Sequence, residues 1–359
     1  MIAAVRVPLF CLLFLFTGRA VLARQVQVGV LGLFHPHEIV LSTAPGEALV
    51  ITAGEGVLVL EPNTAAESAR IQVSRDALVV ECRGQFVHAA EIVAVGRDYR
   101  PTRFALRIPG KISRAYEGIL RVRAVHGEVV PIVAMDFETA VASVVAAELT
   151  QDTPLEDLKA QAVVTRSYYV AGRGRHHDFD FCDTTHCQFL REFPGSESPA
   201  GLAARATRGL VIAFEDKPVA AMFTRSCGGR TRTPAEVGVS SGNYPYYSVG
   251  CDFCYRSPAR WTRKISEQDV ARLLGKGEAG RLAVDRRLGW NTVPSNNFRI
   301  RRADGAVILE GTGQGHGIGL CQRGARAMAE SGATFREILG HYFPNTTLVP
   351  NPDSEKRLR

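Results

Sequence analysis

The sequence lacks several features that would place it in a familiar class of protein. After its first segment it contains no apolar run long enough to span a membrane, no internal repeat and no low-complexity stretch. It has no H-E-x-x-H motif, which argues against a zinc peptidase of that kind. It also has no long basic run and no recognisable nucleic-acid-binding module, so we expect no nucleic-acid partner.

The first segment is short, apolar and followed by small residues. Arg6 precedes an apolar run that ends at Phe16, and Ala20 and Ala23 stand at plausible cleavage positions. The run is too short to span a bilayer comfortably, so we predict a secretory signal peptide over residues 1–23, with an uncleaved anchor as the alternative. We therefore expect an exported protein of the periplasm or cell envelope.

The length and composition are those of a folded protein with a sizeable core. The 359 residues suggest about two domains, and 46% of them are hydrophobic. The formal net charge of +7 falls to about +5 without the two arginines of the first segment. This mild basic excess favours attraction to anionic cell-wall polymers or membrane surfaces.

Two regions of different character follow the first segment. Residues 24–135 contain short apolar runs such as "ALVITA" and "FALRI" between Gly, Pro and Asn, which predicts a β-rich region. Residues 136–349 mix helical periodicity, strand-like runs and glycine-rich turns, and residues 350–359 are typical of a polar tail. We therefore predict an α+β fold, with a β-rich N-terminal region followed by a mixed helix and strand domain.

A glutamate lies on the apolar face of the first predicted helix. In "DFETAVASVVAAELTQ", Val141, Val144, Val145, Glu148 and Leu149 recur at helical spacing and form one stripe. Burial against the valines would disfavour the ionised form of Glu148 and keep part of it protonated near neutral pH, as a general acid requires. The ordinary alternative is a helix-edge residue whose carboxylate reaches water.

A second predicted helix begins with a T-x-x-E capping box. Thr153 can cap it, Glu156 completes the box, and the helix should run to about Gly172. Lys159 and Arg166 lie two turns apart on one face of this helix. They could bind a carboxylate ligand, or they could form an ordinary solvated basic face.

Four motifs, taken in order, resemble the stage II sporulation protein D family, SpoIID/LytB. They are "VVAAELTQDTPLEDLKAQAVVTRSYYV", "CDTTHCQ", "SCGGRT" and "GQGHGIGLCQRGARAMAESGATFREILGHYFP", and they cover about residues 141–344. The resemblance implies that residues 136–349 form a catalytic domain that acts on peptidoglycan, as a lytic transglycosylase of peptide-stripped glycan, or that the protein enhances an amidase. The functional residues that it implies are the catalytic Glu148 and its partners Lys159, Arg166, His316 and Gln322.

The glycine-rich segment of the last motif alternates glycine with other residues. In "GTGQGHGIG" an extended backbone would have one bare face and carry Thr312, Gln314, His316 and Ile318 on the other. Gln314 and His316 could then hydrogen-bond sugar hydroxyls, whereas the alternative is tight packing against another strand. "SCGGRT", with Ser226, allows a similar but weaker interpretation. No G-K-[ST] follows, which argues against a phosphate-binding loop.

"HHDFDFCDTTHC" places histidines and cysteines at metal-ligand spacing. Cys182, His186 and Cys187 form a C-x₃-H-C cluster, and His176 or His177 could complete a tetrahedral set for Zn²⁺. Four protein ligands would leave no open position, so such a zinc would be structural. A Cys182–Cys187 disulfide is the main rival in an oxidising compartment, and the family resemblance implies a zinc here in some members.

The other cysteines allow several arrangements. Of the eight cysteines, seven remain after residues 1–23, so they cannot all pair within the chain. Cys251 and Cys254 form a C-x₂-C motif that could be redox-active, a disulfide, or half of a second metal site with Cys227 or Cys321. We expect a local disulfide or packed thiols.

Together these inferences predict an enzyme that cleaves peptidoglycan glycan strands by a lytic transglycosylase mechanism. A single carboxyl group can protonate the glycosidic oxygen and then take the proton from the muramic acid C6 hydroxyl, which forms 1,6-anhydro-muramic ends. The expected partners are glycan strands and, as a candidate, a cell-wall amidase. The alternative is a non-catalytic cell-wall-binding enhancer of an N-acetylmuramoyl-L-alanine amidase.

Overall fold

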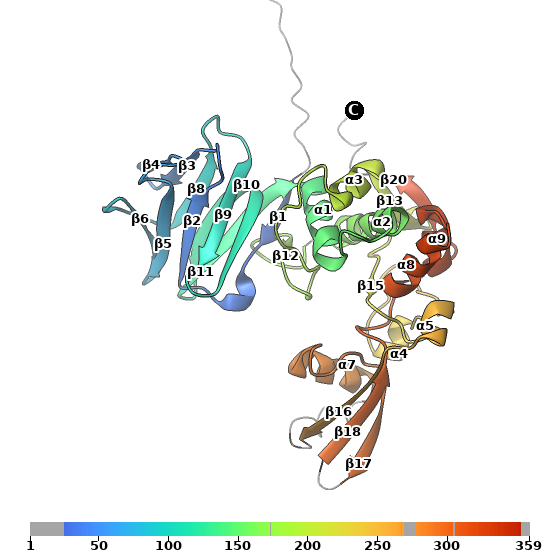
Figure 1. Cartoon of the computed structure of the whole chain (residues 1–359). Helices are drawn as coiled ribbons and strands as arrows, with labels where there is room; N and C mark the ends of the chain where they lie inside the picture. The colour runs from blue at the N-terminus through green and yellow to red at the C-terminus, as the bar shows by residue number, and fades with distance from the viewer. Residues whose placement is uncertain (1–24, 173, 267, 269–276, 304–305, 353–359) are drawn as a thin grey trace, which may run out of the picture.

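The computed structural model describes residues 25–352, apart from residues 173, 267, 269–276 and 304–305. The expected signal peptide and most of the polar tail therefore lie outside the described residues. Figure 1 shows a strand-rich lobe, a central helical lobe, and a small lobe that projects away from the other two. The predicted fold class, a β-rich region followed by a mixed helix and strand region, is confirmed.

The N-terminal lobe is a near-closed barrel of antiparallel strands. The long strand β10 holds it together, because its first half pairs with β9 and its second half pairs with β8 and β11. Gly118 lies where β10 changes partners, and a Cβ there would come within 2.5 Å of the Ala134 carbonyl oxygen. The strands are β1 (Gln25–Gly29), β2 (Glu38–Thr43), β3 (Leu49–Ala53), β4 (Gly56–Leu60), β5 (Ser68–Ser74), β6 (Ala77–Cys82), β7 (Gln85–Ala89), β8 (Glu91–Gly96), β9 (Thr102–Ile108), β10 (Ile112–Val125) and β11 (Glu128–Asp136).

Strand β11 leads directly into the helix that carries Glu148. Asp136 caps α1 (Phe137–Glu148), because its Oδ1 accepts hydrogen bonds from the backbone N–H groups of Glu138 and Thr139 at 2.9 and 3.1 Å. The three valines of the predicted apolar stripe are buried in the core, and Glu148 and Leu149 are half-buried. The chain becomes extended at Leu149, so Glu148 is the last residue of the helix.

Helix α2 (Leu155–Ala171) runs through the middle of the helical lobe and ends at Gly172, as predicted (Figure 1). Its predicted capping box is wrong. Thr153 bonds the Thr150 hydroxyl instead, and the Glu156 carboxylate accepts a 2.7 Å hydrogen bond from the Phe335 backbone N–H. Helix α9 (Phe335–Tyr342), by contrast, does begin with a T-x-x-E box, formed by Thr334 and Glu337.

Short elements complete the helical lobe and bring distant motifs together. β12 (Phe181–Cys182) adds to β1 in parallel and so fixes the His/Cys stretch against the barrel. β15 (Phe223–Thr224) pairs in parallel with β19 (Leu320–Cys321), which places the "SCGG" motif beside the glycine-rich segment. The other elements are α3 (Pro199–Ala206), β13 (Leu210–Phe214), β14 (Lys217–Pro218), α4 (Pro234–Val237), α5 (Asp252–Arg256), α8 (Gln322–Glu330) and β20 (Thr347–Pro350).

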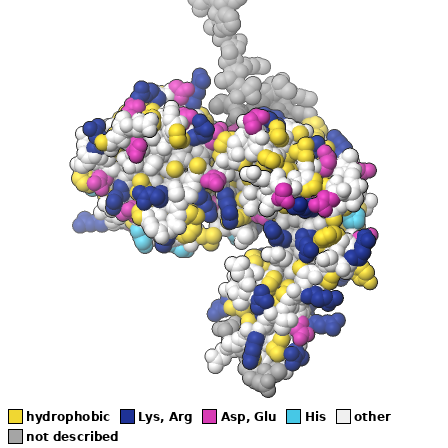
Figure 2. Space-filling model, in the orientation of Figure 1, with side chains coloured by type: hydrophobic (Ala, Val, Ile, Leu, Met, Phe, Trp, Pro, Cys, Tyr) yellow, Lys and Arg dark blue, Asp and Glu magenta, His cyan; other side chains and the backbone are white. Residues whose placement is uncertain are grey.

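In its described residues, the small lobe contains a three-stranded antiparallel sheet and helix α7 around an apolar core of its own. Its elements are β16 (Arg260–Ser266), α7 (Gly277–Leu288), β17 (Phe298–Ala303) and β18 (Ala306–Thr312). Lys and Arg side chains gather over this lobe in Figure 2, among them the exposed Arg263, Lys264, Arg299 and Arg301. Within the part of the chain that the structure describes, no helix has the length and apolar character needed to cross a bilayer.

Candidate functional site

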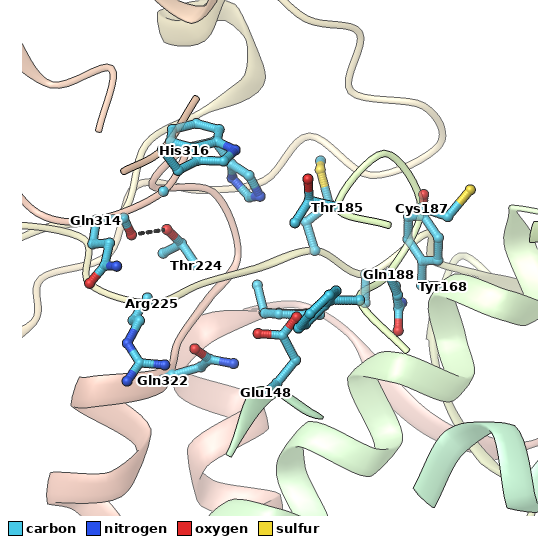
Figure 3. A pocket seen from close by; sticks show the side chains of 16 residues that line it. Glu148, Tyr168, Thr185, Cys187, Gln188, Thr224, Arg225, Gln314, His316 and Gln322 are labelled. Atoms are coloured by element: carbon cyan, nitrogen blue, oxygen red, sulfur yellow. Dashed lines mark hydrogen bonds between the residues drawn. The ribbon is translucent and has the colours of Figure 1, made fainter. Parts of the chain in front are cut away.

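Glu148 opens into a cavity of about 230 Å³ that six separate parts of the chain enclose (Figure 3). These parts are the end of α1, Tyr168 of α2, the end of the His/Cys stretch with the loop after it, the segment that leads to the "SCGG" motif, Trp290 after α7, and the glycine-rich segment with the start of α8. The lining residues are Glu148, Tyr168, Thr185, Cys187, Gln188, Phe189, Ala221, Met222, Phe223, Thr224, Arg225, Trp290, Gln314, Gly315, His316 and Gln322.

The Glu148 carboxyl group is held partly protonated at neutral pH. Burial raises its pKa from 4.5 to about 7, while a hydrogen bond from Gln322 and the charges of Arg225 and Arg191 oppose the rise. The desolvation of the ionised form therefore outweighs the stabilisation by the two arginines. A carboxyl group with a pKa near 7 can donate a proton and later recover it at neutral pH.

Gln322 fixes the position of this carboxyl group. It is the first residue of α8, it is buried, and its Nε2 donates a 3.4 Å hydrogen bond to Oε1 of Gln161 on α2. The same side chain also hydrogen-bonds Glu148. Gln322 therefore couples Glu148 to the packing of α8 against α2, and the structure brings this predicted residue into the site.

His316 and Gln314 also lie in the cavity wall, as Figure 3 shows. The Nδ1 of His316 accepts a 3.0 Å hydrogen bond from the Ile318 backbone N–H, which leaves the hydrogen of the neutral ring on Nε2. Burial, together with the charge of Arg286, lowers the pKa of His316 to about 4. The ring is therefore neutral near pH 7. The Gln314 side chain is exposed at the rim of the cavity.

The backbone of the glycine-rich segment differs from the predicted extended strand. Gly315 and Gly319 have φ values of +94° and +76°, in the left-handed region. A Cβ at Gly319 would lie 2.0 Å from the Met222 carbonyl oxygen, and one at Gly315 would lie 2.6 Å from the Thr224 hydroxyl oxygen. The glycines thus allow this segment to pack closely against residues 222–226. The side chains of Gln314 and His316, which alternate with the glycines, form part of the cavity wall.

Three predicted ligand-binding residues lie away from the cavity. Arg166 is fully buried and pairs with Glu138 at 2.6 Å, and it also donates to the carbonyl oxygens of Ala204 and Leu210. Its guanidinium group therefore joins α1, α2 and α3, and the interpretation of Arg166 as a ligand contact needs correction.

Lys159 and Ser226 are the other two. The Nζ of Lys159 lies 2.6 Å from Oε1 of Glu156, at the contact between α2 and α9. The Ser226 hydroxyl lies 3.5 Å from the Cys254 sulfur, on the side of its strand that faces a group of cysteines. Neither side chain lines the cavity.

Sequence reasoning missed the cations that do act on Glu148. Arg225 lines the cavity, and Arg191 lies close enough to lower the pKa of Glu148. The available signal for Arg225 was its place in the chain, because it directly precedes Ser226 of the "SCGGRT" motif. Four aromatic side chains of the cavity wall were also missed, namely Tyr168, Phe189, Phe223 and Trp290.

A His/Cys centre adjoins the cavity through Cys187. The ligand atoms of His176, Cys182, His186 and Cys187 all lie within 4.8 Å of one another, and both thiols are free. His177 is 97% exposed and pairs with Asp178, so of the two candidate histidines the structure places His176 in the group. Two imidazoles and two thiols at this separation fit a tetrahedral zinc. The rival Cys182–Cys187 disulfide is not formed.

A second group contains Cys227, Cys251, Cys254 and Cys321. All four side chains are buried, and their sulfur atoms lie within 4.8 Å of one another. Cys251 and Cys254 are free thiols, so the C-x₂-C motif does not form the local disulfide that was one part of our expectation. Among the described residues there are therefore two groups of side chains that could bind a metal.

Comparison with known proteins gives one family match and several distant relatives. Residues 125–214 match a family model described as SpoIID, stage II sporulation protein. The stage II sporulation protein D of Bacillus amyloliquefaciens is 27% identical over an alignment of 254 residues, and the match covers 58% of this chain and 72% of the relative.

Two further relatives extend the comparison. An uncharacterized protein of Brachyspira hyodysenteriae is 28% identical over 268 residues, 65% of this chain and 72% of its own length. The amidase enhancer of Bacillus subtilis is 24% identical over 282 residues, but the match spans only 39% of that relative and 56% of this chain. The resemblance predicted from the four sequence motifs is thereby confirmed. Residues 125–214 of this chain are therefore similar to the SpoIID family.

Proposed function

We propose that the protein is an exported lytic transglycosylase that cleaves the glycan strands of peptidoglycan, with Glu148 as its single acid and base. The observation that carries the proposal is a carboxyl group with a pKa of about 7 in the wall of a cavity that is otherwise lined by neutral polar, aromatic and cationic side chains. Glu148 is the sole carboxylate among the lining residues. Ordinary glycosidases use a pair of carboxylates across the bond, so this cavity favours a mechanism with one.

In this mechanism the protonated Glu148 gives its proton to the glycosidic oxygen as the bond from that oxygen to the anomeric carbon breaks. The resulting carboxylate then takes the proton of the muramic acid C6 hydroxyl, whose oxygen bonds to the anomeric carbon. Glu148 ends protonated, as it began, and the product carries a 1,6-anhydro ring. No water is consumed, which distinguishes the reaction from hydrolysis.

The rest of the cavity has groups suited to bind this substrate. The guanidinium group of Arg225 can bind the lactyl carboxylate of a muramic acid whose stem peptide has been removed. The Nε2–H of the neutral His316 and the amide of Gln314 can donate to sugar hydroxyls. The aromatic side chains offer flat apolar surfaces for sugar rings.

Zinc bound by His176, Cys182, His186 and Cys187 would have a structural role. Four protein ligands close the coordination sphere, so the metal would brace the loop that contributes Thr185 and Gln188 to the cavity wall. When bound, it would hold that loop in place, and the proton transfers belong to Glu148 alone.

The alternative is a wall-binding module that stimulates an amidase, and similarity to the Bacillus subtilis amidase enhancer favours it. Either function takes place at the cell wall, where the basic small lobe suits anionic polymers.

The deciding experiment incubates purified protein with peptide-free glycan and analyses the fragments by mass spectrometry. The proposal is supported if wild-type protein releases anhydro-muramic ends and the rate of release falls at least about a hundredfold in the Glu148→Gln variant, because general acid catalysis contributes at least that much. Reducing ends would indicate a hydrolase. An inactive wild-type protein that still stimulates an amidase would establish the alternative.

A further inference from the structure

We propose that Cys227, Cys251, Cys254 and Cys321 bind a second zinc ion through four thiolates, separate from the His/Cys centre. The four residues come from three segments of the chain: the turn of the "SCGG" motif, the start of α5, and the end of β19. Each side chain is at most 4% exposed. A fully buried, closed set of four sulfur ligands is typical of structural zinc sites.

The spacing of the sulfur atoms suits a metal better than a disulfide. Tetrahedral coordination with zinc–sulfur bonds of about 2.3 Å places neighbouring sulfurs about 3.8 Å apart. The Cys254 and Cys321 sulfurs are separated by 3.6 Å, and all four lie within 4.8 Å of one another. A disulfide would instead require about 2.05 Å between two of them.

The surroundings supply hydrogen bonds that thiolates need. The Cys227 backbone N–H donates to the Cys321 sulfur at 3.3 Å, and the Tyr342 hydroxyl donates to the Cys251 sulfur at 3.6 Å. The Ser226 hydroxyl lies 3.5 Å from the Cys254 sulfur. Donors of this kind around ligand atoms hold metal ligands in place and stabilise their charge. They also explain why Ser226 faces away from the cavity.

Helix α8 packs closely against the four-cysteine group. A Cβ at Gly324, on the first turn of α8, would lie 2.6 Å from the Cys251 sulfur and 2.0 Å from the Tyr342 hydroxyl oxygen. The helix can therefore approach the sulfurs only because this residue is glycine. The four cysteines belong to the apolar core of the helical lobe, away from solvent.

The position of this site gives it a role in the cavity, and that role rests on the proposed function. Cys321 directly precedes Gln322, and Cys227 lies two residues after Arg225; both neighbours act on the Glu148 carboxyl group. The two segments also meet through a 3.2 Å hydrogen bond from the Arg323 backbone N–H to the Arg225 carbonyl oxygen. A metal that ties Cys227 to Cys321 would fix Arg225 and Gln322 relative to each other.

The metal site itself can be tested without any assay of activity. In the Cys182→Ser/Cys187→Ser variant, which lacks the first centre, elemental analysis should find about one zinc per chain. X-ray absorption should show only sulfur ligands, at about 2.3 Å. Wild-type protein should hold about two zinc ions, with nitrogen ligands in addition, and mass spectrometry of unreduced wild-type protein should find Cys227, Cys251, Cys254 and Cys321 as thiols.

Three results would overturn the proposal. The first is a Cys182→Ser/Cys187→Ser variant that holds no zinc while the wild-type protein holds one. The others are nitrogen ligands on the zinc of that variant, or a mapped disulfide among the four cysteines. A substitution within the four-cysteine group gives a second test of the site. Cys227→Ser should lose one zinc and lower the melting temperature, whereas Cys82→Ser, at a buried cysteine outside both groups, should keep both metals.

Failure of the proposed function would be distinguishable from failure of this inference. A wild-type protein that binds two zinc ions and releases no anhydro-muramic ends would support the four-cysteine zinc site and refute the proposed transglycosylase activity. If Cys227→Ser keeps the wild-type zinc content, the four-cysteine site is refuted whatever the activity.

Discussion

Replacing Glu148 by Gln should make the folded protein more stable at alkaline pH while it abolishes glycan cleavage. Burial raises the pKa of the folded carboxyl group from 4.5 to about 7, so ionised Glu148 destabilises the folded state relative to the unfolded chain. Gln has nearly the same shape, can still hydrogen-bond Gln322, and is never ionised. A gain in stability that accompanies a loss of activity is the expected trade-off at a functional site.

The magnitude and the pH window follow from the two pKa values. Below pH 4.5 the carboxyl group is protonated in both states, so its ionisation costs the folded protein nothing. Between 4.5 and about 7 the unfolded chain loses the proton and the folded chain keeps it, so the free energy of unfolding falls as pH rises. Above about 7 the loss is complete and amounts to on the order of 3 kcal/mol, at about 1.4 kcal/mol per pKa unit.

The assay compares the melting temperatures of wild type and Glu148→Gln at several pH values. At about pH 8 the variant should melt several degrees higher, and at about pH 5.5 its advantage should shrink to roughly half or less. The difference between the two proteins cancels pH effects that both share, including those on metal binding. Glu55→Gln, at an exposed glutamate of the β3–β4 hairpin, is the matched control and should change nothing.

Two results would refute this reasoning. If Glu148→Gln melts at the wild-type temperature at every pH, the carboxyl group is not desolvated and cannot be the poised acid. If the variant is less stable at about pH 8, the ionised carboxylate contributes favourable contacts that outweigh its burial. Full release of anhydro-muramic ends by the variant would remove Glu148 from the mechanism altogether.

Local sequence patterns predicted the parts of the fold that local interactions determine. The stripe of valines located α1 and placed Glu148 on it, and glycine marked the end of α2. A T-x-x-E box is present at Thr334. The identical box at Thr153 did not form, because Glu156 reaches the backbone of Phe335, which is distant in sequence. Patterns alone cannot reveal such a competing partner.

The composition of the cavity depends on contacts between distant segments, and there the predictions were less accurate. Arg166 and Arg225 are both arginines beside candidate motifs, yet Arg166 pairs with Glu138 in the core while Arg225 reaches the cavity. Their roles depend on how α1, α2 and α3 pack, which spacing within one helix does not specify. The cysteines are a similar case, because Cys227 and Cys321 join the C-x₂-C motif only after the parallel pairing of β15 and β19.

Further substitutions separate the structural residues from those of the cavity. Arg166→Met should lower the free energy of unfolding by about 3–5 kcal/mol in urea titrations, because it leaves a carboxylate without its buried partner, and should leave the KM of folded protein unchanged. His316→Gln should reduce glycan turnover without changing the pH profile between about pH 5 and 8, because the imidazole, with a pKa of about 4, stays neutral there. Arg225→Gln should act on Glu148 directly. The Arg225 charge lowers the pKa of Glu148, so its removal should raise that pKa further and extend the active, protonated form to higher pH, while KM rises because the substrate carboxylate loses its partner. The measurement is the pH profile of kcat/KM on peptide-free glycan, with Arg230→Gln, whose guanidinium group pairs with Glu236, as the matched control. An alkaline limb that stays in place in Arg225→Gln would show that this arginine binds substrate without acting on Glu148, and an equal shift in Arg230→Gln would show that net charge alone moves it.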